Sequence, residues 1–134
     1  MPSRPKGDSS LIVNGEEFRT RLAEEIERSE RYEHPFSILV MRPPKTAGER
    51  ETIKASPWFD SLIRSLVRGC DVVSVLELGP TIAVLLPETD VSGAGSLLER
   101  LIAAIDDKNQ EWEYTLFEYP LNQASIEDFL EQAA

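Results

Sequence analysis

One histidine and one cysteine, His34 and Cys70, are the side chains in this sequence best suited to nucleophilic catalysis or zinc binding. A catalytic triad or an ordinary zinc site needs histidine beside serine, cysteine or further histidines, and a single histidine supports neither. We therefore interpret His34 as a surface-loop histidine. We interpret Cys70, at the junction of a helix and a strand, as a small packed thiol.

The glycines and the paired carboxylates also give no clear indication of a phosphate-binding, metal-binding or catalytic site. Gly93 and Gly95 lie in SGAGS at the start of a predicted helix, but the lysine and glycine spacing of a phosphate-binding loop are missing. The acidic pairs 106–107 and 127–128 lie at predicted helix ends, where capping or solvation explains them. We identify no catalytic group and no metal ligand set, so we expect neither a cofactor nor enzymatic activity.

The composition of the chain limits the kinds of partner that it can bind. The 134 residues carry a net charge of −10, and the 14 Lys and Arg are interleaved with acidic residues, which argues against nucleic acids and anionic membranes. No apolar run approaches the roughly 20 residues that span a bilayer, and one cysteine suits a reducing cytoplasm. We expect a flexible tail over 1–12 and a single cytoplasmic domain over 13–134.

Four helices are predicted. The first has Asn14 as N-cap with Glu17 three residues later, and its acid-first pairs include Glu24 and Arg28. The second begins at Ser56-Pro57 and stops near residue 69, and the third covers 92–106. The last is short, with Ser125 as its predicted cap. These helices and the strands between them are expected to position the residues of any functional site.

Four strands alternate with these helices. Residues 35–41 form a continuous apolar run, and 112–119 alternate and are rich in aromatics. Between them, DVVSVLEL and TIAVLLP flank a Gly-Pro turn and predict a hairpin. The order predicts an α/β (α+β) fold, in which a mixed, mostly antiparallel sheet with a ferredoxin-like core carries helices on its faces.

Several segments resemble the GGDEF domain, the diguanylate cyclase fold of bacterial signalling. FRTRLAEEIERSERYEHPFSILVM is similar to its opening helix and strand, and LIRSLVRGCDVVSV to the helix and strand before its signature hairpin. IAVLLPETDVSGAGSLLERL and TLFEYPLNQASIEDFLEQA resemble the elements that follow. The resemblance covers roughly residues 14–133, with a compressed middle excursion and an early end to the last helix.

The signature itself is degenerate. Where the family has Gly-Gly-Asp-Glu-Phe, this chain has the five residues Leu78, Gly79, Pro80, Thr81 and Ile82. The resemblance implies that Thr81 replaces one acid that holds Mg²⁺ and that Arg42, after the first strand, replaces the other. Arginine in a Mg²⁺ site repels the ion, which needs oxygen ligands. The resemblance therefore implies a domain without cyclase activity.

One further family feature matches. Many cyclases have an Arg-x-x-Asp motif before the hairpin that binds the product, cyclic di-GMP, as an inhibitor, and Arg68 and Asp71 fit it. Arg100 on the next helix is placed to join such a site. The alternative is purely structural, because Arg favours a helix C-terminus and Asp favours a turn. The spacing to the degenerate signature is also one residue longer than usual, so both interpretations stay open.

Two functions remain for testing. The first is an inactive GGDEF-like regulatory module that acts through a protein partner, with a homodimer left open. The second is a cyclic di-GMP receptor that uses Arg68, Asp71 and Arg100.

Overall fold

The computed structural model describes residues 12–42, 57–76, 81–106 and 112–132. In chain order the elements are β1 (Ile12–Val13), α1 (Gly15–Tyr32), β2 (Phe36–Arg42), α3 (Pro57–Leu66), β3 (Val72–Leu76), β4 (Thr81–Leu86), α4 (Val91–Asp106), β5 (Glu113–Tyr119) and α5 (Gln123–Gln132). The predicted excursion over 43–56 and the turn residues 78–80 lie outside the described residues.

The sheet has the strand order β1-β3-β4-β2-β5. β3 and β4 pair antiparallel, as do β4 with β2 and β2 with β5, while the short β1 pairs parallel with β3. The predicted hairpin is confirmed by the β3–β4 register. Four strands in the order β3-β4-β2-β5, with α3 and α4 as the connections, form the predicted ferredoxin-like core.

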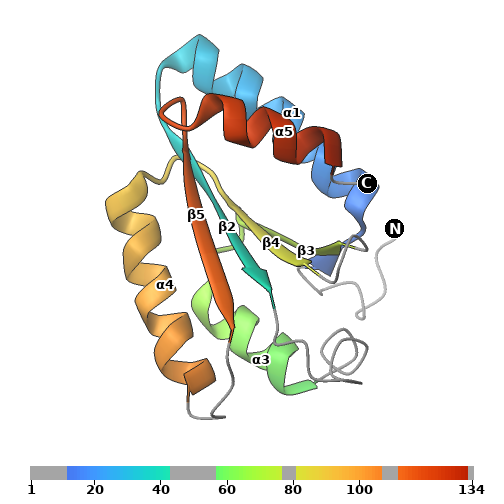
Figure 1. The fold of residues 1–134 in the computed structure, drawn as a ribbon, viewed down its shortest axis with the longest axis vertical. Helices are drawn as coiled ribbons and strands as arrows, with labels where there is room; N and C mark the ends of the chain where they lie inside the picture. Colours follow the sequence, from blue (N-terminus) through green and yellow to red (C-terminus); the bar gives the residue numbers. More distant parts are fainter. Residues whose placement is uncertain (1–11, 43–56, 77–80, 107–111, 133–134) are drawn as a thin grey trace.

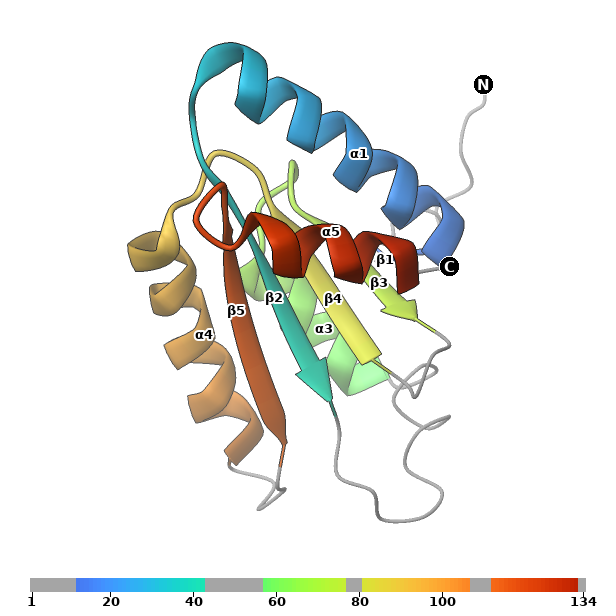
Figure 2. The ribbon, with the colours of Figure 1, turned by 45° about the horizontal axis from the view of Figure 1, so that its top comes forward.

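Helices cover both faces of the sheet, as Figures 1 and 2 show: α1 and α5 lie side by side on one face, and α3 and α4 lie on the other. The strands alternate in side-chain direction, so neighbouring residues enter different layers. Ile38 and Val40 pack under α1 and α5, and Leu39 and Met41 face α3 and α4. β2 is therefore buried on both faces, which explains its unbroken apolar run.

α1 packs on its own sheet. Asn14 accepts a hydrogen bond from the Glu17 N–H at 2.8 Å, which confirms the predicted N-cap. Phe18 and Leu22 are fully buried in the layer that α1 shares with α5. Arg28 does not pair with Glu24 as its spacing suggested, because its guanidinium reaches Glu88 after β4 at 3.0 Å.

One prediction about the chain ends was wrong. Ser125 does not cap α5, which begins at Gln123. Asn122 occupies the capping position, and its side chain accepts from the Glu118 N–H at 2.9 Å, which joins the helix start to β5. Ile12, assigned to the predicted tail, pairs with Val73 in β1, and residues 1–11 lie outside the described residues.

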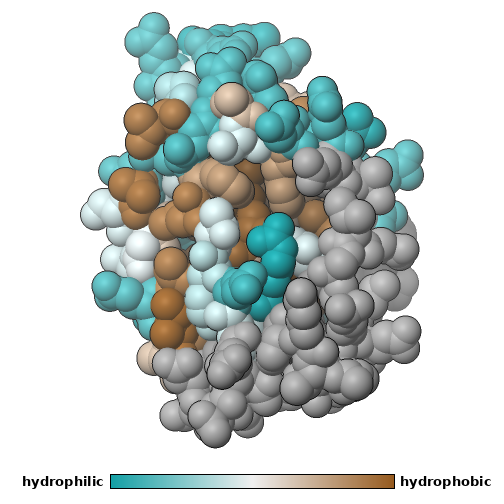
Figure 3. Space-filling model, viewed as in Figure 1, coloured by the Kyte–Doolittle hydropathy of each residue, from teal (hydrophilic) through white to brown (hydrophobic). Residues whose placement is uncertain are grey.

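The surface is unevenly polar. In Figure 3 hydrophilic residues dominate the end of the molecule where α1 meets β2, and apolar residues gather over α4 and beside β5. Among the described residues no helix is long and apolar enough to cross a membrane.

Candidate functional site

The degenerate signature lies at one end of the sheet. Met41 pairs with Ile82, so Arg42 and Thr81, one step further along the two antiparallel strands, belong to the same end. Arg42 is exposed and Thr81 is buried. The structure thus brings together the two positions that the resemblance assigns to metal-binding acids, and neither carries a carboxylate. In the described ranges no three or more His, Cys, Asp or Glu residues are grouped to hold a metal ion.

The opposite end of the sheet carries the Arg-x-x-Asp segment. α3 ends at Leu66, and the four residues 68–71 then form a tight turn, in which the Asp71 N–H donates to the Arg68 carbonyl at 3.1 Å. The Asp71 carboxylate accepts from the Arg68 N–H at 2.7 Å and from the Arg68 Nη2 at 3.0 Å. The Asp71 side chain is only 2% exposed, and that of Arg68 is 54% exposed. The hydrogen bond to Asp71 raises the pKa of Arg68, so the guanidinium stays charged.

Arg68 also connects the turn to the segment after β4. Its Nη2 donates to the Pro87 carbonyl at 3.0 Å and to the Thr89 hydroxyl at 2.8 Å. Thr89 in turn donates its hydroxyl hydrogen to the Pro87 carbonyl. Thr89 was not predicted as a site residue, although it lies in the AVLLPETD segment that carried part of the resemblance.

The three residues predicted for a ligand site line one cavity. Arg68, Asp71 and Arg100 border a space of about 210 Å³ between the turn, the end of β4 and α4. Leu66, Leu86 and Leu97 give it an apolar side. Arg100 is exposed, whereas Asp71 is already saturated by Arg68. Within the described ranges Arg100 has no recorded ion pair and Arg68 is partly engaged by Asp71, a setting that suits an anion.

His34 and Cys70 lie near this end but do not form a reactive pair. The His34 Nε2 is 3.9 Å from the Glu88 carboxylate, its side chain is 25% exposed, and its ring stacks on Tyr32. His34 therefore lies in the loop between α1 and β2, as predicted, with its side chain partly buried. Cys70 is free and exposed, contrary to the predicted packed thiol, and its Sγ lies 3.8 Å from Asp71.

Comparison with known proteins identifies the fold. No protein-family model and no curated protein match the sequence. Among solved structures, a DGC protein from Thermotoga maritima is similar with a TM-score of 0.74 and 18% identity, over 93% of this chain and 97% of that one. The GGDEF domain of DgcB from Caulobacter crescentus, in complex with c-di-GMP, is similar with a TM-score of 0.71 and 14% identity. The match covers 99% of this chain and 88% of that one.

A third solved structure adds a partner protein. The diguanylate cyclase SiaD from Pseudomonas aeruginosa, in complex with its activator SiaC, gives a TM-score of 0.61 and 18% identity over 90% of this chain and 52% of that one. These TM-scores show that the chain has the fold of GGDEF domains, and identities of 14–18% limit the similarity to the fold.

Proposed function

We propose that this chain is a catalytically inactive GGDEF-like module of bacterial cyclic di-GMP signalling that acts in the cytoplasm by binding a protein partner. The observation that carries the proposal is the pair Arg42 and Thr81 at one end of the sheet. A cyclase that activates GTP with two metal ions needs carboxylates there, and a cation beside a hydroxyl does not bind Mg²⁺. Incubation with Mg·GTP tests this part directly, and the proposal expects no cyclic di-GMP.

The binding role is supported by the apolar surface. In the part of the chain that the structure describes, three large apolar side chains are exposed: Tyr32 (62%), Val91 (49%) and Leu121 (76%). Tyr32 precedes β2, Val91 follows β4 and Leu121 follows β5. Because β2 runs antiparallel to β4 and β5, these three positions lie at the same end of the sheet. Hydrophilic residues otherwise dominate this end (Figure 3), and exposed apolar groups within polar surroundings favour contact with another protein. A solved relative in fold, SiaD, binds its activator SiaC, which is consistent with this role.

Affinity capture from the native host tests the interaction. The bait is the tagged chain, and the comparison bait carries Tyr32→Ser, Val91→Ser and Leu121→Ser. The proposal expects a protein retained by the wild-type chain and lost with the triple variant, or self-association lost in the same way. A chain that captures nothing specific and stays monomeric contradicts the proposal.

Cyclic di-GMP binding is the second candidate, and the shared cavity of Arg68, Asp71 and Arg100 favours it. In this candidate Arg100 binds a phosphate or a guanine edge, and Arg68 contributes with the part of its guanidinium that Asp71 leaves available. The burial of Asp71 limits its role to holding Arg68.

Titration calorimetry with cyclic di-GMP separates the two candidates. The receptor hypothesis expects heat at micromolar ligand that is lost in Arg100→Ala and kept in Arg19→Ala, an exposed arginine on α1 that serves as control for lost charge. Absence of heat at high ligand concentration removes the receptor hypothesis and leaves the interaction module untouched.

A further inference from the structure

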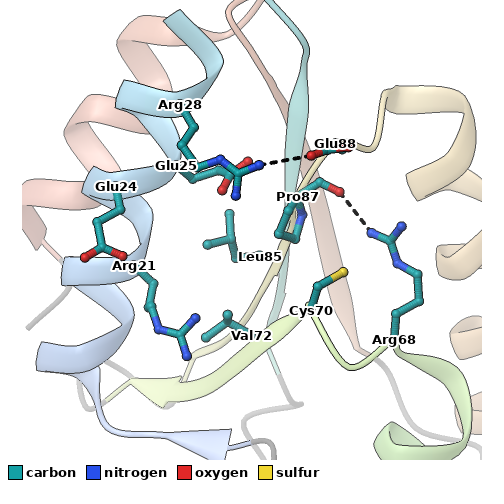
Figure 4. A pocket seen from close by; sticks show the side chains of 10 residues that line it. All are labelled: Arg21, Glu24, Glu25, Arg28, Arg68, Cys70, Val72, Leu85, Pro87 and Glu88. Atoms are coloured by element: carbon teal, nitrogen blue, oxygen red, sulfur yellow. Dashed lines mark hydrogen bonds and ion pairs between the residues drawn. The ribbon is translucent and has the colours of Figure 1, made fainter. Parts of the chain in front are cut away.

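A second cavity, larger than the one at Arg100, lies on the other side of the sheet (Figure 4). Its volume is about 340 Å³, and it opens between α1 and the segments before β3 and after β4. Val72 and Leu85, from the layer under α1 and α5, form its apolar floor. This volume falls in the range of small-molecule sites, which start at about 300 Å³.

A buried carboxyl group borders this cavity. Glu25 on α1 is only 5% exposed, and its Oε2 is buried without a hydrogen-bond partner in the described part of the chain. Burial raises the pKa of Glu25, the nearby Arg28 and His34 oppose that rise, and Glu88 adds to it. A buried carboxyl oxygen without a partner is costly to the fold, so its position on a cavity wall points to a donor supplied by a ligand.

Arginines border the same space on the helix side. Arg21 extends across the opening toward Val72, and Arg28 lies two turns further along α1, beside Glu25 (Figure 4). The side chains of Arg21 and Arg28 are 47% and 51% exposed. Among the described residues Arg21 has a single long contact of 3.6 Å, with Glu17, and Arg28 binds Glu88 through one nitrogen, Nη2. Both guanidiniums keep donors for an anionic group.

The charges of the lining are of both signs. Three arginines and three glutamates line the cavity around the apolar floor: Arg21, Arg28 and Arg68, and Glu24, Glu25 and Glu88. The glutamates would repel a ligand that carries only negative charge, and the arginines would repel a ligand that carries only positive charge. A ligand that carries both charges complements the lining, because each of its groups has an opposite partner at hand.

We propose that this cavity binds a small zwitterion of the α-amino-acid type, whose ammonium donates to Glu25, whose carboxylate accepts from Arg21 and Arg28, and whose side chain lies on Val72 and Leu85. The site is separate from the cavity at Arg100, although Arg68 borders both. Arg68 is occupied by Asp71, Pro87 and Thr89, so it forms a wall rather than a ligand contact.

Thermal unfolding with each of the twenty L-amino acids tests the proposal. A ligand at about 100 times its Kd is expected to raise the melting temperature by several degrees. Glu25→Gln keeps the size of the side chain and removes its charge, and it should abolish the rise, while Glu27→Gln, exposed on the same helix, should keep it. Arg21→Gln, on the exposed rim, provides a second variant that should weaken binding if Glu25→Gln does not fold.

Matched ligands decide the chemistry. The N-acetylated form of the amino acid that stabilises the protein lacks the ammonium, and the C-terminal amide of the same amino acid lacks the carboxylate. Neither compound should stabilise the protein. The proposal is overturned if none of the twenty amino acids shifts the melting temperature. It is also overturned if the N-acetylated form stabilises the protein equally well, or if the amino acid stabilises the Glu25→Gln variant as much as the wild type.

Proton linkage gives an independent readout. Among the groups around Glu25, Arg28 and His34 favour its ionised form and Glu88 disfavours it. An arriving ammonium adds to the first set and lowers the pKa of Glu25. Calorimetry in two acidic buffers of different ionisation enthalpy should therefore show a proton released on binding. Proton uptake, or no exchange at any acidic pH, contradicts the role of Glu25.

Discussion

Removal of Asp71 should destabilise the fold far more than removal of Arg100. In Asp71→Ala the Arg68 N–H loses its acceptor at 2.7 Å and the guanidinium loses its contact at 3.0 Å. A hydrogen bond to a charged group contributes about 1.5–3 kcal/mol, and the half-exposed guanidinium contributes less than a buried one. We expect the free energy of unfolding to fall by about 3 kcal/mol in Asp71→Ala.

Arg68→Ala should cost less, about 1.5 kcal/mol, because its backbone N–H still donates to Asp71. The coupling energy between the two residues in a double-mutant cycle should be about 1 kcal/mol. Arg100→Ala, which changes an exposed side chain, should stay within about 0.5 kcal/mol of the wild type.

Urea unfolding followed by far-UV circular dichroism measures the wild type, the three single variants and the double variant, with the slope m checked for constancy. A coupling energy near zero, or a loss in Arg100→Ala as large as that in Asp71→Ala, would show that the Arg68–Asp71 turn does not hold the end of the sheet together.

Three further predictions concern stability. Asn14→Ala should lower the free energy of unfolding by about 1 kcal/mol by removing the cap of α1, as urea unfolding would show, and Asn14→Gly should cost only a few tenths. Tyr119→Phe should cost about 1 kcal/mol by removing the 2.7 Å hydrogen bond to Glu30, with the Phe36 stack kept. The pKa of Glu25 is raised above 4.5 in the fold, so its stabilising contribution is complete below pH 4.5 and declines as pH rises through the folded value. The stability of the wild type relative to Glu25→Gln should therefore decrease from acidic to neutral pH, and an increase would contradict the raised pKa.

The fold was largely predictable because its signals are local. The cap at Asn14 and the apolar runs of β2, β3 and β4 each depend on residues close in sequence. The cap of α5 was assigned wrongly because two capping residues, Asn122 and Ser125, lie within one turn of each other. The hydrogen bond from the Ile126 N–H to the Asn122 carbonyl starts the helix at Gln123 and decides between them.

The candidate sites were less predictable because they depend on contacts between distant elements. Nothing in the spacing of Arg28 favours Glu88 over Glu24, and the burial of Glu25 under β3 and β4 follows from how α1 lies on the sheet. The pair Arg68 and Asp71 was found from a motif, but its saturation by internal hydrogen bonds, with Thr89 as a third member, required the packed structure.

Product formation from GTP tests the central claim most directly. The purified chain is incubated with Mg·GTP at a protein concentration equal to that of the nucleotide, beside an active diguanylate cyclase, and the products are separated by chromatography. The pair Arg42 and Thr81 at the sheet end predicts that GTP is recovered unchanged while the active enzyme converts it. Cyclic di-GMP formed by this chain would contradict the account.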